Sequence, residues 1–180
     1  MKKKFLSLLL VLCFVMAFGS ITALAAEGQT TDIWDGTADT SWYMGHETES
    51  EYHITTAEQL AGLAQLINTG TITFKGKTVY LDNDLDLDKR EWISIGKGKG
   101  GNQAAYSFCG IFDGQGHVIS NLYSRDSRMP KTNVGDDKEN CYRQGLFGNV
   151  YDGEVKNLGI ENADIIVDLN DASTYGKGIL

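Results

Sequence analysis

The stretch GIFDGQGHVISNL at residues 110–122 is similar to a second stretch further along the chain, GLFGNVYDGEVKNLGIENADI at residues 145–165. The first glycines of the two stretches lie 35 residues apart, and the leucines of their Asn-Leu steps lie 36 residues apart. Self-similarity at a period of about 20–50 residues is typical of repeat proteins, in which each unit buries its apolar face against the next. The predicted structural repeat consists of Gly110, Phe112, Asn121, Leu122, Gly145, Phe147, Asn157 and Leu158.

Asn121 and Asn157 occupy the same position of this repeat. Their amides are therefore predicted to stack in a ladder that satisfies backbone groups of the turns. The alternative is that they are two unrelated turn asparagines.

Two stretches in which apolar residues alternate with other residues flank the repeat. Leucines at 81, 85 and 87 alternate with aspartates at 82, 84, 86 and 88, and apolar side chains at 165, 167 and 169 alternate in a similar way. Both patterns predict short strands with one buried face, and we expect the two faces to point into one core.

A single amphipathic helix is predicted at about residues 55–68. Thr55-Thr56-Ala57-Glu58 has the form of a capping box, and Asn68-Thr69-Gly70 provides a glycine for the C-terminal cap. Leu60, Leu63, Ala64 and Ile67 form one apolar face. We expect this helix to cap the first repeat unit.

Taken together, these stretches resemble exported bacterial surface proteins that carry the GLUG motif. The stretches TTAEQLAGLAQLIN (55–68), GKTVYLDNDLDL (76–87) and WISIG (92–96) are similar to the lead-in before such repeats. The resemblance implies an all-β fold, a right-handed parallel β-helix (solenoid) with an N-terminal capping helix, over residues 54–180. It implies a cell-surface or secreted module and provides no catalytic residue. Because the chain ends after a glycine-rich turn where a further coil is expected, the sequence also predicts a fragment of a longer protein, with self-association through the open edge as the alternative.

Residues 1–25 have the three parts of a secretory signal peptide. Three lysines precede an apolar run from Phe5 to Phe18, and Ala23-Leu24-Ala25 is a small-residue cleavage site. The run of 14 residues is shorter than the ~20 that a membrane-spanning helix needs, so no membrane insertion is expected after cleavage. The sequence therefore predicts a secreted or cell-surface protein.

Composition narrows the possible partners. The 180 residues are 42% hydrophobic and 22% charged, which excludes a disordered chain. Without residues 1–25, 13 basic residues face 24 acidic ones, a formal net charge of −11. Nucleic acid is therefore excluded as a partner, because binding it relies on cationic contacts. An extracellular glycan or protein ligand is expected.

No cofactor and no catalytic residue are predicted. Asp82, Asp84 and Asp86 are weak candidates for Ca²⁺, although the loop lacks the glycine and glutamate of an EF-hand. The leading hypothesis is a non-catalytic stalk or adhesin-like binding surface. The alternatives are a fragment of a pectate-lyase-like carbohydrate-active enzyme and the non-catalytic part of a GLUG-containing peptidase.

Two further features leave alternatives open. Residues 26–53 form a polar lead-in with Trp34, Trp42 and Tyr43, which is expected to fold against the domain, or else to stack on sugars as an exposed patch. Cys109 and Cys141 are compatible with a disulfide in an exported protein, but two cysteines do not make a disulfide framework, and two free thiols are the alternative.

Overall fold

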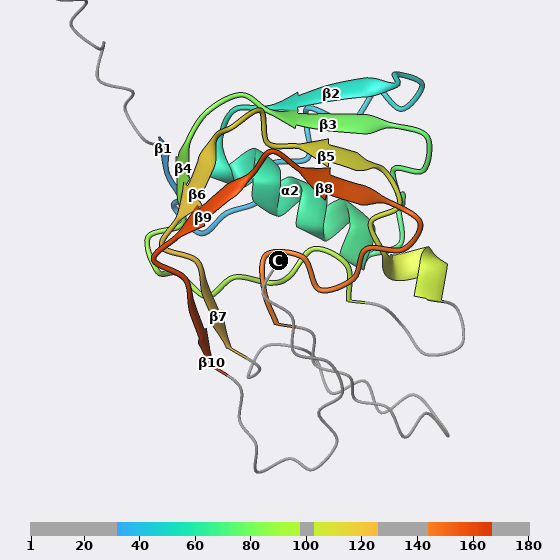
Figure 1. Ribbon diagram of the computed structural model, residues 1–180. Helices are drawn as coiled ribbons and strands as arrows, with labels where there is room; N and C mark the ends of the chain where they lie inside the picture. The colour runs from blue at the N-terminus through green and yellow to red at the C-terminus, as the bar shows by residue number, and fades with distance from the viewer. Residues whose placement is uncertain (1–31, 98–102, 126–143, 167–180) are drawn as a thin grey trace, which may run out of the picture. The chain divides into compact units, whose positions relative to one another are not determined.

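The computed structural model describes residues 32–97, 103–125 and 144–166 of the chain (Figure 1). These residues form three small parallel sheets, one α-helix and one short 3-10 helix, η2 (Gln103–Tyr106). The predicted signal peptide and its cleavage site lie outside the described residues.

Every strand pair in the described ranges is parallel. One sheet has the order β2 (Glu51–Ile54), β3 (Thr78–Leu81), β5 (Ile111–Asp113) and β8 (Glu154–Lys156). A second sheet has the order β1 (Asp32–Ile33), β4 (Leu85–Asp86), β6 (Val118–Ser120) and β9 (Gly159–Glu161). The third sheet pairs β7 (Tyr123–Arg125) with β10 (Asp164–Ile166).

The predicted helix is confirmed as α2 (Ala57–Asn68), but its capping box lies one residue later than expected. The hydroxyl of Thr56 accepts from the Gln59 backbone N–H, and Gln59 Oε1 accepts from the Thr55 backbone N–H at 2.8 Å. At the other end Gly70 has a φ of +76°, as the predicted glycine cap requires.

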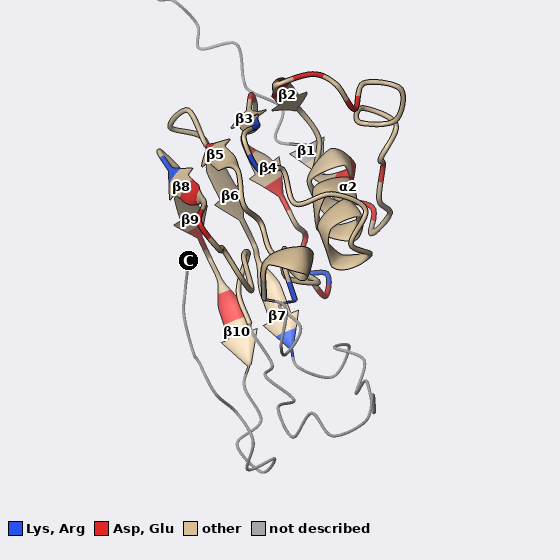
Figure 2. Cartoon of the chain, turned by 90° about the vertical axis from the view of Figure 1, so that its right-hand side faces the viewer, with Lys and Arg blue, Asp and Glu red and all other residues tan. Residues whose placement is uncertain are grey.

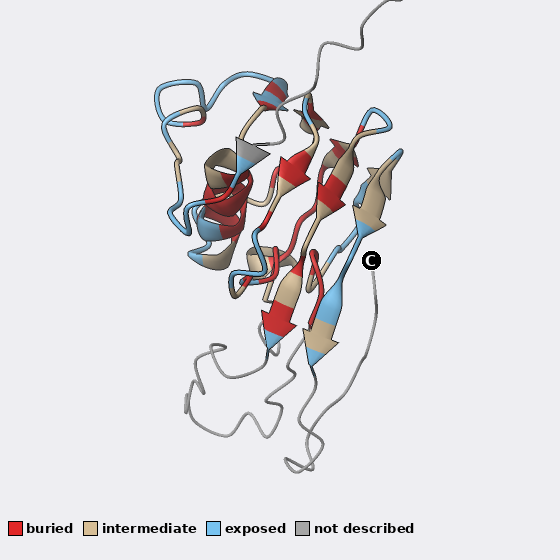
Figure 3. Cartoon of the chain, turned by 90° about the vertical axis from the view of Figure 1, so that its left-hand side faces the viewer, coloured by how far each residue is buried: buried red, intermediate tan, exposed pale blue. Residues whose placement is uncertain are grey.

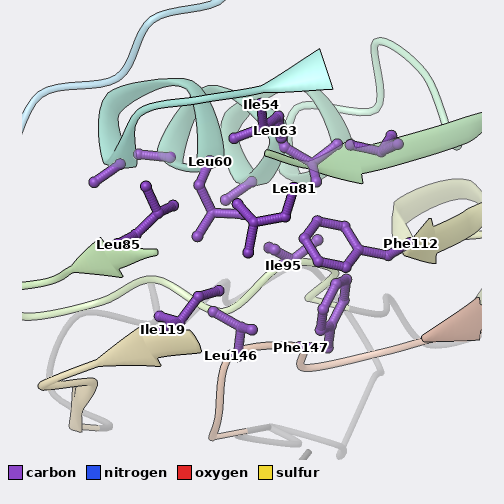
Figure 4. Packing of buried hydrophobic residues seen from close by; sticks show 14 of the residues in the cluster. Ile54, Leu60, Leu63, Leu81, Leu85, Ile95, Phe112, Ile119, Leu146 and Phe147 are labelled. Carbon is purple, nitrogen blue, oxygen red and sulfur yellow. The ribbon is translucent and has the colours of Figure 1, made fainter. Parts of the chain in front are cut away.

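The hydrophobic core lies between α2 and the sheets (Figure 4). Leu60 and Leu63 point from the helix toward side chains of the strands and of the segments around Ile95 and Leu146. Leu81, Leu85 and Leu87 are fully buried in this same core, which confirms the prediction for the first alternating pattern. In the second pattern Ile165 is only half-buried, and residues 167 and 169 lie outside the described ranges.

The predicted all-β solenoid with a helical cap is wrong. The described strands are two to four residues long and are divided among three small sheets, with no closed barrel or solenoid among the described residues, so the fold is a mixed α/β one. The helix belongs to the core rather than to one end, because eight of its twelve residues are buried. A helix that only covered the end of a solenoid would bury a single apolar stripe and expose the rest of its surface.

The backbone of the lead-in segment covers the outer side of α2. A Cβ added to Gly62 would lie 1.8 Å from the carbonyl oxygen of Asp39, so only glycine permits this approach. Trp34 and Tyr43 are buried in the core as well. The lead-in therefore folds against the domain, as predicted, through Trp34, Tyr43 and Tyr52, while most of its other residues are exposed (Figure 3).

The strand register differs from the predicted 35-residue period. Ile111 pairs with Glu154 and Ile119 with Ile160, while Phe147 forms an isolated parallel bridge with Ile95. The GLFG stretch at 145–148 therefore does not occupy the place in a sheet that GIFD occupies at 110–113.

Candidate functional site

A cavity of about 370 Å³ opens between α2 and two loop segments on one side of the core. Its walls are the Ala61 and Ala64 face of the helix, the loop at residues 36–38, and the segment from Glu91 to Ile93. Cavities of ~300–1,000 Å³ with mainly apolar walls are the usual form of a small-molecule site. This cavity is therefore the candidate binding site.

Two tryptophans line the cavity. Trp34 is the residue directly after β1, and Trp92 lies in the segment that follows β4. Their ring centroids lie 5.4 Å apart with an interplanar angle of 69°, an edge-to-face arrangement that fixes both indoles. Two hydrogen bonds anchor Trp92 further. Its backbone N–H donates to the Tyr123 carbonyl oxygen at 2.7 Å, and its indole Nε1–H donates to the Leu146 carbonyl oxygen at 3.1 Å.

Sequence reasoning identified only part of this cavity. It singled out Trp34 together with Trp42 and Tyr43 as a candidate exposed aromatic patch, but Trp42 and Tyr43 pack around the buried ring of Phe74. Trp92 and Ile93 were overlooked as site residues. No sequence signal marks them, because the features that define them as site residues, the 47% exposure of Ile93 beside the buried Trp92, exist only in the folded chain.

The carboxylates proposed for Ca²⁺ each have a partner within the protein. Asp82 Oδ2 lies 2.8 Å from His53 Nδ1, and Asp82 Oδ1 accepts from Gln115 Nε2 at 2.6 Å. Asp84 Oδ1 accepts from the Val118 backbone N–H at 2.9 Å. The same Asp84 oxygen lies 2.9 Å from Nδ1 of His117. These contacts, the backbone N–H first, hold the pKa of Asp84 below its ordinary value.

Asp86 and the repeat asparagines form a different pattern from the predicted ladder. Asn121 Nδ2 donates to Asp86 Oδ1 at 2.7 Å, and Asn157 Nδ2 donates to Asp113 Oδ1 at 3.0 Å. Each amide therefore donates a hydrogen bond to an aspartate, and the two amides do not stack on one another. Both asparagines have a positive φ, +57° and +52°, which suits their place in turns.

The remaining repeat residues lie in or beside the core. Phe112 and Phe147 meet edge to face with their centroids 5.4 Å apart. Leu122 is buried and Leu158 is half-buried against the core. There is no room for a side chain at Gly110, because a Cβ there would lie 2.6 Å from the carbonyl oxygen of Phe74. Gly145 has a positive φ of +137°, and its carbonyl oxygen accepts from the buried Ser94 hydroxyl.

No three His, Cys, Asp or Glu side chains in the described ranges are grouped so that they could hold a metal ion. Acidic residues occur singly on β4, β8 and β10 (Figure 2). Asp82, Asp84 and Asp86 thus serve as turn and side-chain acceptors in this structure.

Cys109 is buried, and its Sγ lies 3.6 Å from the Ser107 carbonyl oxygen. The second cysteine of the possible disulfide, Cys141, lies outside the described residues. Within the described ranges no helix is both long enough and apolar enough to span a membrane.

Comparison with known proteins gives one similarity. The chain is 30% identical over 155 residues to a segment of halomucin from Haloquadratum walsbyi. The match covers 80% of this chain and only 2% of halomucin. No protein-family profile matches the chain, and no solved structure matches it.

Proposed function

We propose that the chain is an exported, non-catalytic module of a surface protein that acts as a stalk or an adhesin-like binding surface. The observation that carries this proposal is the similarity to halomucin over most of the chain, which is compatible with a surface-protein module. The signal-peptide pattern of residues 1–25 supports export. Membership of the GLUG-repeat proteins remains part of the proposal, on the strength of the stretches at 110–122 and 145–165.

The binding role is supported by the cavity beside α2. In this cavity the apolar side chain of Ile93 is accessible beside two indoles that pack edge to face. The non-catalytic role is supported by the separate pairing of Asp82, Asp84 and Asp86, since acid–base and metal chemistry require such groups to converge on one substrate.

Incubation of the full chain with pectins and related glycans, with and without Ca²⁺, tests the non-catalytic role. We expect no turnover under either condition. Turnover that disappears in the triple variant Asp82→Asn, Asp84→Asn, Asp86→Asn would contradict the proposal. A variant in Asp152, an exposed residue on another loop, is the matched control for loss of negative charge.

A further inference from the structure

Most of the polar residues that line the cavity are engaged within the protein, Glu91 among them, while the amide of the exposed Gln65 is left to water. Trp34 Nε1 donates to the Thr37 carbonyl at 2.7 Å, and Trp92 Nε1 donates to the Leu146 carbonyl at 3.1 Å. Both indole N–H groups therefore point to backbone acceptors, and what the rings offer to a ligand is their carbon surface.

The amide and hydroxyl groups at the helix end of the cavity are engaged in the same way. Asn68 Nδ2 donates to the Ser94 carbonyl at 2.9 Å, and Asn68 Oδ1 accepts from the Gly96 N–H at 3.0 Å. The Thr69 hydroxyl donates to the carbonyl of Gln65 at 2.8 Å. The ammonium group of Lys97 lies over the ring of Tyr106, 5.1 Å from its centroid. Gln65 is exposed, so water can solvate its amide whether or not the cavity is filled.

From this arrangement we infer that the cavity binds an uncharged apolar group of a small molecule, aromatic or aliphatic, in preference to a saccharide. A sugar needs hydrogen-bond partners for its hydroxyl groups, and burying a hydroxyl without a partner is costly. An apolar group needs only the carbon surfaces of Trp34, Trp92, Ala64 and Ile93. The inference deepens the proposed binding function, on which it rests, by naming the chemistry of one ligand.

The mouth of the cavity provides a matched pair of variants. Ile93 lies in its lining and is 47% exposed, whereas Ile166 in β10 is 40% exposed and lies outside the lining. Ile93→Glu puts a charge beside the bound apolar group, and Ile166→Glu makes the same chemical change elsewhere. Ala64→Leu fills part of the cavity from the helix side.

The experiment is a titration of the full chain and its variants with N-phenyl-1-naphthylamine, a neutral apolar fluorophore. Excitation of tryptophan and detection of naphthylamine emission report binding near the tryptophans, Trp34, Trp42 and Trp92, and the variants test whether the cavity is the site. All variants keep the apolar N-terminal segment, so its contribution is the same in each. Thermal unfolding of every variant, followed by circular dichroism, shows that it is folded.

We expect saturable energy transfer in the unmodified chain and in Ile166→Glu, and at least a tenfold weaker affinity in a folded Ile93→Glu. If Ala64→Leu fails to fold, the comparison of Ile93→Glu with Ile166→Glu still tests whether the fluorophore binds in the cavity. Equal affinity in the two glutamate variants would overturn the inference, and so would displacement of the fluorophore by mono- or disaccharides. Failure of export, which the proposed function requires, is measured separately on cells and leaves this comparison unaffected.

Discussion

Nδ1 of His117 lies 2.9 Å from Oδ1 of Asp84 and so ties the turn after β5 to the turn after β3, 33 residues apart in the chain. The same carboxylate oxygen accepts from the backbone N–H of Val118, the first residue of β6. Asp84 therefore fixes two successive strand connections, a role that differs from the metal binding for which its sequence made it a candidate.

The first prediction concerns the pH dependence that Asp84 brings. Its pKa in the folded protein is lowered from 3.8, chiefly by the Val118 N–H and then by His117. The carboxylate therefore adds to the free energy of unfolding at pH values above 3.8, and the contribution is lost as pH falls through the lower folded pKa. We expect Asp84→Asn to lower the melting temperature at pH 7 and to flatten its fall on acidification.

Melting temperatures from pH 7 down to pH 3 check this prediction. Asp152→Asn is the control, because Asp152 is exposed and its only described partner is Lys75 at 3.6 Å. An unchanged pH profile in Asp84→Asn would show that the two contacts contribute nothing to stability.

The second prediction tests the N-terminal cap of α2. Thr56→Ala removes the hydroxyl that accepts from the Gln59 N–H, and the loss of such a cap costs about 1 kcal/mol. Thr56→Ser keeps the hydroxyl and should retain most of the stability. The measurement is the free energy of unfolding in urea. Equal losses in the two variants would contradict a capping role for the hydroxyl.

The third prediction reverses the effect expected from helix propensity. Alanine is favoured over glycine inside a helix by about 1 kcal/mol, yet Gly62→Ala should destabilise the protein because its Cβ would lie 1.8 Å from the Asp39 carbonyl oxygen. Gln65→Ala, on the exposed side of the same helix, should be close to neutral. A Gly62→Ala variant with a raised urea midpoint would show that the lead-in does not pack on α2.

Local patterns predicted those parts of the fold that depend on local chemistry. The helix, its glycine cap and the buried leucines at 81, 85 and 87 follow from periodicity and turn chemistry, which a single segment contains. Parallel pairing of short strands was also part of the prediction, and the strand pairs show it.

The register and the architecture depend on contacts that periodicity does not encode. Gly110 and Gly145 look equivalent in sequence, but the strand at Ile111 pairs with Glu154, because the segment around Phe147 pairs with Ile95 instead. The burial of α2 likewise depends on the approach of Asp39 to Gly62, between segments 23 residues apart. Such contacts are tertiary, and they override the local pattern.

The candidate site was predicted least well for a related reason. Its tryptophans lie 58 residues apart in the chain, at Trp34 and Trp92, and no spacing rule joins them. The sequence drew attention instead to the aspartates at 82, 84 and 86, whose regular alternation reflects a strand and its turns.

Export is the central claim, and the mass of the chain recovered outside an expressing cell tests it most directly. We predict a product that consists of residues 26–180, cleaved after Ala25. Ala25→Arg should block cleavage because that position requires a small residue, whereas Leu24→Arg, at the middle position of the Ala23-Leu24-Ala25 site, should still be processed. A full-length chain that stays inside the cell, unaffected by either substitution, would contradict the proposal.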